Sequence, residues 1–356
     1  MKRKLIVSML CASMVAGMVV VPALAVKADE SKGVIGVAMP TQDLQRWNQD
    51  GENMKKELEE KGYEVDLQFA GNEVAQQVSQ VQNMIANGDQ LLVIASIEGD
   101  SLGTVLAEAK EADIPVIAYD RLIMNTDAVS YYATFDNYLV GKTQGEYLVE
   151  ALDLENQDGP FNIELVTGDP GDNNVNFFFG GAMDVLQPYI DEGKLVVPSG
   201  QVTKEEVATA NWATETAQAR FENILSSYYA DGTNLDAVLA SNDSTALGVA
   251  NALAANYTGE YPIITGQDCD IANMPNIIDG KQAMSVFKDT RTLASKVVEM
   301  VDAIMQGGEA PVNDSETYDN GTGVIPSYLC EPVAVTADNY KEMLVDSGYY
   351  TEDQLQ

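Results

Sequence analysis

Short apolar runs alternate with stretches of helical periodicity along most of this chain, and this alternation limits the possible folds more than any other feature. Residues 34–39 form an apolar run of the kind found in strands that are covered on both faces. Met54 and Leu58 then lie four residues apart among charged residues, and Gly62 follows where a helix would end. Repetition of this strand-helix order predicts an α/β fold with parallel sheets.

The alternation occurs in two successive sets, each of which predicts one doubly wound, Rossmann-like lobe. No linker rich in Ser, Gly or Pro separates the sets, which favours a hinge of several strands over a flexible tether. A last strand-helix-strand-helix passage is expected to complete both lobes by crossing between them. The expected strands are 34–39, 64–69, 91–95, 114–119, 161–166, 195–197, 237–240, 262–265, 284–287 and 324–335, and the expected helices are 52–61, 74–85, 101–112, 177–190, 213–229, 246–255, 293–305 and 338–346.

Composition excludes several classes of function. The 356 residues include 55 Asp and Glu against 20 Lys and Arg, and a formal charge of -35 disfavours binding to nucleic acid or to anionic membranes. The chain has no histidine, which excludes Ser-His-Asp and Cys-His catalysis and histidine-ligated zinc. We therefore expect no catalytic residues of those kinds, no metal ion and no cofactor.

The N-terminus has the three parts of a secretory signal peptide. A basic start is followed by an apolar stretch from Leu5 to Val21 and by small residues at Ala23 and Ala25. The apolar span is short for a transmembrane anchor, so we expect a signal peptide over residues 1–25, cleaved after Ala25 or alternatively after Ala28. Bulky residues precede Cys11, which argues against a lipoprotein anchor there. The exported protein would be periplasmic, extracellular or at the cell surface.

The cysteines of the mature chain leave two alternatives open. Three cysteines in the whole chain are too few for a disulfide scaffold. Cys269 and Cys330 would remain after cleavage, and their spacing does not decide whether they pair or stay free.

Polar and aromatic side chains follow nearly every expected strand. Ligands of open α/β sheets bind just beyond the carboxyl ends of the strands, so these positions form the candidate site. In chain order they are Arg46 and Trp47, Asp120 and Arg121, Asp172 and Asn174, Asn211 and Trp212, Asn242 and Asp243, Gln267 and Asp268, and Lys288 and Asp289.

This set of side chains suits a sugar. Carboxylates accept hydrogen bonds, Arg and Lys donate them, and Asn does both, which matches the adjacent hydroxyl groups of a sugar ring. The indoles of Trp47 and Trp212 offer apolar faces for the C–H side of a pyranose. The charges expected in the pocket are nearly balanced, which favours a neutral ligand over an anion. The cations are Arg46, Arg121 and Lys288, and the carboxylates are Asp120, Asp172 and Asp268.

Each position also has a purely structural interpretation. Asp172, Asn242 and Asp243 suit helix N-caps, Asp120 and Arg121 suit a local ion pair, and the two tryptophans suit ordinary packing. A structural role is a reasonable explanation for any one of these residues. It does not explain why the whole set lies at strand ends.

Several segments together resemble the type I periplasmic sugar-binding proteins of ABC transporters over essentially the whole mature chain. The similarity is greatest to the xylose-binding and multiple-monosaccharide-binding receptors. The segments are residues 46–47, 118–123, 131–137, 172–174, 266–268, 287–290 and 324–329.

The resemblance implies two lobes that close on one sugar about a three-strand hinge. It places crossings near residues 136, 288 and 324, which gives an N-terminal lobe of 33–136 plus 289–324 and a C-terminal lobe of 137–288 plus 325–356. It assigns hydrogen bonds with the sugar and two apolar walls to particular side chains. The hydrogen-bonding residues are Arg46, Asp120, Arg121, Asp172, Asn174, Asn242, Asp268 and Lys288, and the walls are Trp47 and Trp212.

The implied function is capture of a monosaccharide such as xylose, glucose, galactose or arabinose and its delivery to an ABC permease by a monomeric protein. Asn242 and Asp243 resemble the corresponding loop of the xylose-binding receptors, whereas most of the other segments resemble the multiple-sugar receptors. The resemblance therefore does not decide which sugar is preferred. A sugar receptor that signals to a chemoreceptor or sensor kinase is an alternative. A glycosidase that uses Asp120 and Asp268 is less favoured because three cations accompany the acids. The export signal and the net negative charge argue against a transcription regulator. The absence of repeats argues against an adhesin.

Overall fold

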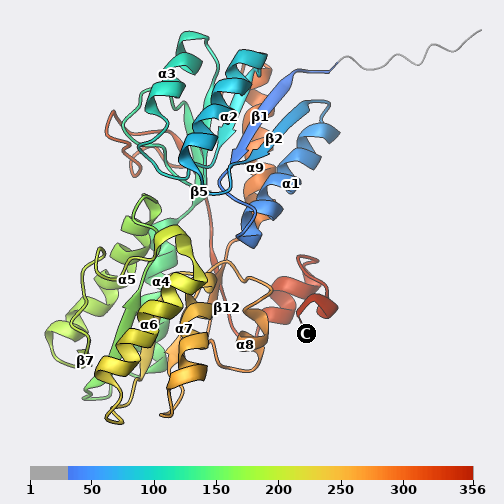
Figure 1. Cartoon of the computed structure of the whole chain (residues 1–356). Coiled ribbons are helices and arrows are strands. Elements are labelled where there is room, and N and C mark those ends of the chain that lie inside the picture. The colour runs from blue at the N-terminus through green and yellow to red at the C-terminus, as the bar shows by residue number, and fades with distance from the viewer. Residues whose placement is uncertain (1–30, 356) are drawn as a thin grey trace, which may run out of the picture. The chain divides into compact units, whose positions relative to one another are not determined.

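The computed structural model describes residues 31–355, and they have the predicted α/β fold with parallel sheets (Figure 1). The expected signal peptide, its two alternative cleavage sites and Cys11 lie outside these residues. No helix within residues 31–355 has both the length and the apolar character that a membrane span requires.

The first lobe is a six-stranded sheet with helices on both faces. All of its strand pairs are parallel, in the order β11-β5-β4-β3-β1-β2. Alternate strand residues pack against α1 and α9 on one face and against α2 and α3 on the other, as the two-residue period of a strand requires. The elements are β1 (Val34–Met39), α1 (Gln45–Glu60), β2 (Glu64–Phe69), α2 (Val74–Asn87), β3 (Leu91–Ile94), α3 (Gly103–Glu111), β4 (Val116–Tyr119), β5 (Tyr131–Phe135), α9 (Thr290–Met305) and β11 (Ser327–Cys330).

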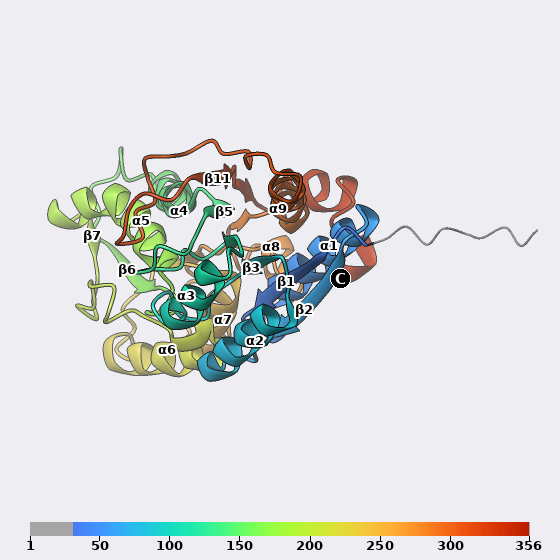
Figure 2. The same cartoon turned by 90° about the horizontal axis from the view of Figure 1, so that it is seen from above.

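The second lobe repeats this layered arrangement. Its parallel sheet has the order β7-β6-β8-β9, and β10 and β12 form an antiparallel pair that a bridge from Gln267 to Val286 joins to it. One face is covered by α4 and α5 and the other by α6 and α7 (Figure 2). The elements are α4 (Asn137–Ala151), β6 (Phe161–Val166), α5 (Asn174–Asp191), β7 (Leu195–Val196), α6 (Thr214–Tyr228), β8 (Ala237–Ala240), α7 (Asp243–Asn256), β9 (Ile263–Ile264), α8 (Met274–Ile278), β10 (Ser285–Phe287) and β12 (Val333–Val335), with helical turns at Ala210–Trp212, Lys341–Asp346 and Glu352–Leu355.

The chain crosses between the sheets three times. It leaves the first sheet after β5, returns to it after β10, and leaves again between β11 and β12. Asp136 and Asp289 stand at the first two crossings, and each caps the following helix by accepting a backbone N–H group.

The third crossing differs from the sequence-based boundary. The apolar run 324–335 was expected to be one strand, and residues 325–356 were assigned to the second lobe. In the structure, β11 pairs with β5 in the first sheet, and only β12 pairs with β10 in the second lobe. Pro332 lies between the two strands, and because proline has no N–H group to donate, the run divides there.

Each lobe directs the carboxyl ends of its parallel strands toward the other lobe. Parallel pairing gives all strands of a sheet the same direction, so the loops that follow them gather at one edge. The predicted site residues follow these strands, and the fold therefore places them between the two sheets.

Candidate functional site

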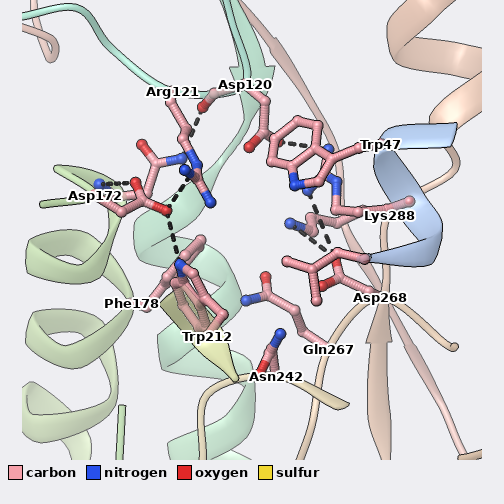
Figure 3. Close-up of a pocket in the computed structure, with 13 residues that line it drawn as sticks. Trp47, Asp120, Arg121, Asp172, Phe178, Trp212, Asn242, Gln267, Asp268 and Lys288 are labelled. Atoms are coloured by element: carbon pink, nitrogen blue, oxygen red, sulfur yellow. Dashed lines mark hydrogen bonds and ion pairs between the residues drawn. The ribbon is translucent and has the colours of Figure 1, made fainter. Parts of the chain in front are cut away.

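All ten predicted site residues line one pocket between the lobes (Figure 3). Leu44, Phe178 and Gln267 also line the pocket, although no ligand contact was predicted for them. Gln267 was among the strand-end candidates, but the resemblance assigned no sugar contact to it. Phe178 lies inside an apolar helical stretch, where no sequence signal separates a pocket wall from core.

Arg46 lies at the centre of a cluster of carboxylates. Its guanidinium donates to Asp50 Oδ2 from Nε (3.2 Å) and Nη2 (3.0 Å), and its Nη2 is 2.8 Å from Asp120 Oδ1. Its Nη1 is 3.6 Å from Asp268 Oδ1 in the other lobe. Burial disfavours the charge, but Asp120, Asp50 and Asp268 outweigh that effect and raise the pKa of Arg46 well above its ordinary value.

Asp50 orients the guanidinium of Arg46 by accepting two hydrogen bonds from it. Asp50 was not among the residues predicted from the sequence. Asp50 is fully buried one helical turn after Arg46, and Tyr119 donates its hydroxyl to the same carboxylate. Burial raises the pKa of Asp50 to about 6, and the charge of Arg46 limits the rise. The helix was expected only from residue 52, whereas α1 begins at Gln45 and so places Asp50 on the same helix face as Arg46.

Asp120 and Arg121 do not form the local ion pair that was considered from the sequence. Asp120 pairs with Arg46, whereas Arg121 Nε is 3.1 Å from Asp172 Oδ2 in the other lobe. Arg121 also donates through Nη1 to the backbone carbonyls of Ser96 (3.1 Å) and Ile97 (3.2 Å). The two neighbouring residues therefore serve different lobes.

The two carboxylates differ in their protonation tendency. Burial tends to raise the pKa of Asp120, but Arg46, Lys288 and Arg121 together lower it. Burial raises the pKa of Asp172, and only Arg121 opposes this as a nearby cation.

Asn174 joins the lobes through its amide group. Its Nδ2 donates to the carbonyl of Asp120 (2.7 Å), and its Oδ1 accepts from the hydroxyl of Tyr132 (3.1 Å). Both partners belong to the first lobe, so Asn174 contributes to the closed arrangement as well as to the pocket wall.

Two indoles form the apolar walls. Trp47 has the guanidinium carbons of Arg46 and Arg121 at 4.5 and 5.1 Å from its ring centroid. Trp212 lies against the backbone of Gly168, where a Cβ atom would overlap its ring, and Phe178 contacts it edge-on at 6.1 Å. The Trp212 indole donates to Asp172 Oδ2 (3.3 Å), which fixes its orientation.

The backbone is strained at three site residues. Asp120, Trp212 and Asp268 have φ values of 59°, 56° and 91°, in the left-handed region that side chains other than glycine rarely adopt. Such strain concentrates at functional sites, where the surrounding structure holds it in place.

Five buried polar atoms of the pocket have no hydrogen-bond partner among residues 31–355. They are Trp47 Nε1, Asp120 Oδ1, Arg121 Nε, Gln267 Oε1 and Asp268 Oδ1. The two carboxylate oxygens and Arg121 Nε have an oppositely charged group at ion-pair distance, but they form no hydrogen bond. Buried polar groups are normally hydrogen-bonded, so two donors and three acceptors in one pocket indicate a ligand with several hydroxyl groups, which both donate and accept.

The second lobe supports Asp268 through an inner layer of polar residues. Lys288 Nζ is 3.0 Å from Asp268 Oδ1. Behind them, Asp243 accepts from Gln282 Nε2 (2.7 Å), Ser285 Oγ (2.9 Å) and the backbone N–H of Asp270 (2.9 Å). The structure assigns the N-cap of α7 to Asn242, which also lines the pocket, and not to Asp243.

Cys269 and Cys330 are free thiols, and both are buried. This decides between the two alternatives that their spacing had left open. No cluster of three His, Cys, Asp or Glu residues in the described part of the chain is arranged to hold a metal ion.

Comparisons with known proteins agree with the predicted resemblance. The family model described as periplasmic binding protein domain matches residues 35–309. The multiple sugar-binding periplasmic protein SbpA of Azospirillum brasilense is 50% identical over 92% of each chain. The D-xylose-binding periplasmic protein of Escherichia coli K12 is 37% identical over 100% of each chain.

A solved structure gives the same result. An ABC transporter solute binding protein from Clostridium phytofermentans with bound β-D-glucose is 73% identical, covers 91% of this chain and 100% of its own, and superposes with a TM-score of 0.90. The chain belongs to the periplasmic binding protein family.

Proposed function

We propose that this chain binds one neutral monosaccharide outside the cytoplasm and delivers it to an ABC transporter permease. The ligand class is an aldopyranose such as D-glucose, D-xylose, D-galactose or L-arabinose. The ten predicted residues would bind it: Arg46, Asp120, Arg121, Asp172, Asn174, Asn242, Asp268 and Lys288 by hydrogen bonds, and Trp47 and Trp212 by their apolar faces.

One observation carries the proposal. Five buried polar atoms that line the pocket between two indole walls have no hydrogen-bond partner within residues 31–355. The carboxylate and guanidinium atoms among them have ion-pair contacts only. Sugar hydroxyl groups donate and accept hydrogen bonds and would satisfy these atoms, while the C–H face of the ring would lie against an indole. Three cations and three carboxylates line the pocket, which suits a ligand without net charge.

The names of the relatives support the same ligand class. Two curated relatives are described as binding multiple sugars and D-xylose, and the similar solved structure contains β-D-glucose. We therefore place D-glucose first among the sugars to be tested, followed by D-xylose.

Delivery follows from closure of the lobes. The pocket residues come from both lobes, so a sugar bound to all of them favours the closed form over an open one. The permease would recognise the closed form, and a chemoreceptor or sensor kinase that recognises the same surface is a second output. The protein would act as a monomer after export and removal of residues 1–25.

We further propose that the chain does not hydrolyse glycosides. A retaining or inverting glycosidase needs one carboxyl group that stays protonated beside a second carboxylate. Asp120 has a lowered pKa beside Arg46, and Asp268 is held by Lys288. Incubation with nitrophenyl glycosides should release no nitrophenol, and measurable turnover would contradict this part of the proposal.

A thermal-shift screen of the mature protein tests the ligand class. The sugars are D-glucose, D-xylose, D-galactose, L-arabinose, D-ribose and D-fructose, with calorimetric titration of every sugar that raises the melting temperature. A ligand that binds only the native state adds about 2.7 kcal/mol of stability at 100 times its Kd. No shift with any sugar would contradict the ligand class. A Trp212→Ala variant that keeps the affinity within twofold would contradict the site.

A further inference from the structure

Helix α1 has two adjacent faces, and one of them forms part of the pocket. Arg46 and Trp47 line the pocket and Asp50 bonds to Arg46, whereas Gln45 and Gln49 lie one residue earlier on the adjacent face. Residues four apart share a helix face, so both glutamines present their amides in the same direction. Neither glutamine lines the pocket.

The C-terminal segment packs onto the second lobe. Leu344, Tyr350 and Leu355 are buried in a cluster with Met274 and Ile277 of α8. Figures 1 and 2 both place this segment beside α1 of the first lobe. The segment therefore belongs to one lobe by its apolar contacts and reaches the other.

Two consecutive tyrosines make the contact with α1. Gln45 Nε2 donates to the hydroxyl of Tyr350, and the hydroxyl of Tyr349 donates to Gln49 Oε1 at 3.0 Å. The Tyr349 ring contacts Phe287 edge-on at 4.8 Å, next to the crossing after β10. Tyr349 is thus held near the hinge by Phe287, and Tyr350 bonds to Gln45 at the N-terminal end of α1.

Gln45 also binds the backbone close to Asp268. Its Oε1 accepts from the N–H group of Ile271 at 3.0 Å. Asp268, three residues earlier, is 3.6 Å from Arg46. The lobe approach that brings Asp268 to Arg46 therefore also brings Ile271 and Tyr350 to Gln45.

We propose that Tyr349 and Tyr350 are positioning residues, which bond to Gln45 and Gln49 when the lobes close and thereby hold Arg46 and Trp47 against the sugar. The inference rests on the proposed function, because it concerns the affinity of the same pocket. The partners belong to different lobes, so opening separates them and their bonds stabilise only the closed form. The sugar affinity is then set partly by residues that do not touch the sugar.

The test is a Tyr349→Phe/Tyr350→Phe double variant, with D-glucose and D-xylose as probes. Each neutral hydrogen bond contributes a factor of roughly 2 to 10 in an equilibrium constant, so we expect the Kd to rise about 5- to 50-fold. The rise should come from faster dissociation, measured by stopped-flow fluorescence of the pocket tryptophans. The melting temperature without sugar should stay within about 1 °C of wild type, because the phenyl rings still fill their places.

Two further variants keep the result interpretable. Tyr340→Phe is the matched control, because Tyr340 lies in the same segment, packs against the same cluster and forms no side-chain hydrogen bond within residues 31–355. It should bind with wild-type affinity. Gln45→Met removes the amide from the opposite side of the contact and should raise the Kd in the same direction, even if the double variant fails to fold.

The outcomes separate this inference from the proposed function. If wild type binds none of the sugars, the proposed function fails. If wild type binds but the double variant and Gln45→Met keep its Kd within twofold, the positioning role is wrong and the proposed function stands. An equal loss of melting temperature with and without sugar would indicate a purely structural contact and would also overturn the inference.

Discussion

The two lobes contribute to the pocket in different ways. In the first lobe, Arg46 is paired with Asp50 and Asp120 of its own lobe. In the second lobe, Asp268 is likewise paired with Lys288 of its own lobe, but Asp172 has its cation, Arg121, on the opposite lobe. Charges paired within a lobe stay paired when the lobes separate, whereas a pair shared between lobes forms only on closure. The first arrangement serves stability of the lobe, and the second serves closure.

The largest expected effect comes from replacing each of the two pocket arginines by methionine. Arg46→Met removes the cation that lies nearest to the buried carboxylates of Asp50 and Asp120. Loss of one member of a buried ion pair lowers the free energy of unfolding by about 3–5 kcal/mol. Arg121→Met leaves Asp172 free to meet water in the open form, so the loss without sugar should be about 1 kcal/mol. Both variants should bind D-glucose at least 100-fold more weakly. Urea unfolding without sugar and calorimetric titration measure the two effects.

Equal destabilisation of the sugar-free protein by both substitutions would contradict the contrast between the lobes. Lys110→Met is a control, since Lys110 pairs with Asp127 on the exposed surface of the first lobe, outside the pocket.

The indole wall of the second lobe gives the next effect. In Gly168→Ala, the new methyl group would overlap the Trp212 ring and displace it. Overpacking costs about 1–3 kcal/mol, so the Kd for sugar should rise roughly 5- to 100-fold. Gly180→Ala in α5 is the matched control, because a Cβ there meets no atom within 4 Å. It should keep the affinity and raise the melting temperature slightly, since alanine favours the helix. Unchanged affinity in Gly168→Ala would remove Trp212 from the site.

The buried carboxyl groups of the two lobes should titrate in different pH ranges. Burial raises the pKa of Asp50 to about 6, and burial together with Asp268 raises that of Asp270 to about 7. A carboxyl with a higher pKa in the folded than in the unfolded chain binds its proton more tightly when folded. The contribution of Asp50 to the free energy of unfolding therefore falls as the pH rises from about 4 to about 6 and is constant above pH 6. The contribution of Asp270 falls from about pH 4 to about pH 7 and is constant above pH 7.

Melting curves between pH 4.5 and 8 check this difference. Asp50→Asn should flatten the dependence up to pH 6, and Asp270→Asn should flatten it up to pH 7. A wild-type protein whose stability rises across this range would contradict both assignments.

The smallest effect concerns the thiols, one in each lobe. Cys330 in β11 and Cys269 beside Asp268 are free and buried, and burial raises the pKa of Cys330 to about 12 and that of Cys269 well above its ordinary value. A reductant should leave the melting temperature of the mature protein unchanged. Native protein should react with no thiol reagent, and urea should expose two thiols. Thiols that appear only after reduction would indicate a disulfide.

Much of the site was accessible from the sequence because the strand-end rule is local. An apolar run marks a strand, and the residues after it lie at the sheet edge where ligands bind. Arg46, Asp120, Trp212 and Asp268 were found in this way, and all ten predicted side chains line the same pocket. Asp50 and Phe178 were missed because they lie within helices, where a polar or apolar residue has many other roles.

The sequence alone determined the α/β class, the two lobes and most of the strands, because apolar periodicity is a property of neighbouring residues. It missed β5 and α4 and joined β11 and β12 into one strand. Only the tertiary structure decided which charges pair. Asp120 forms an ion pair with Arg46 and not with its neighbour Arg121, and Arg121 forms one with Asp172. Tyr349 and Tyr350 of the C-terminal segment form hydrogen bonds with α1. These contacts join residues far apart in the chain, and the energy of a buried ion pair or hydrogen bond depends on distance and burial, which a linear pattern does not contain.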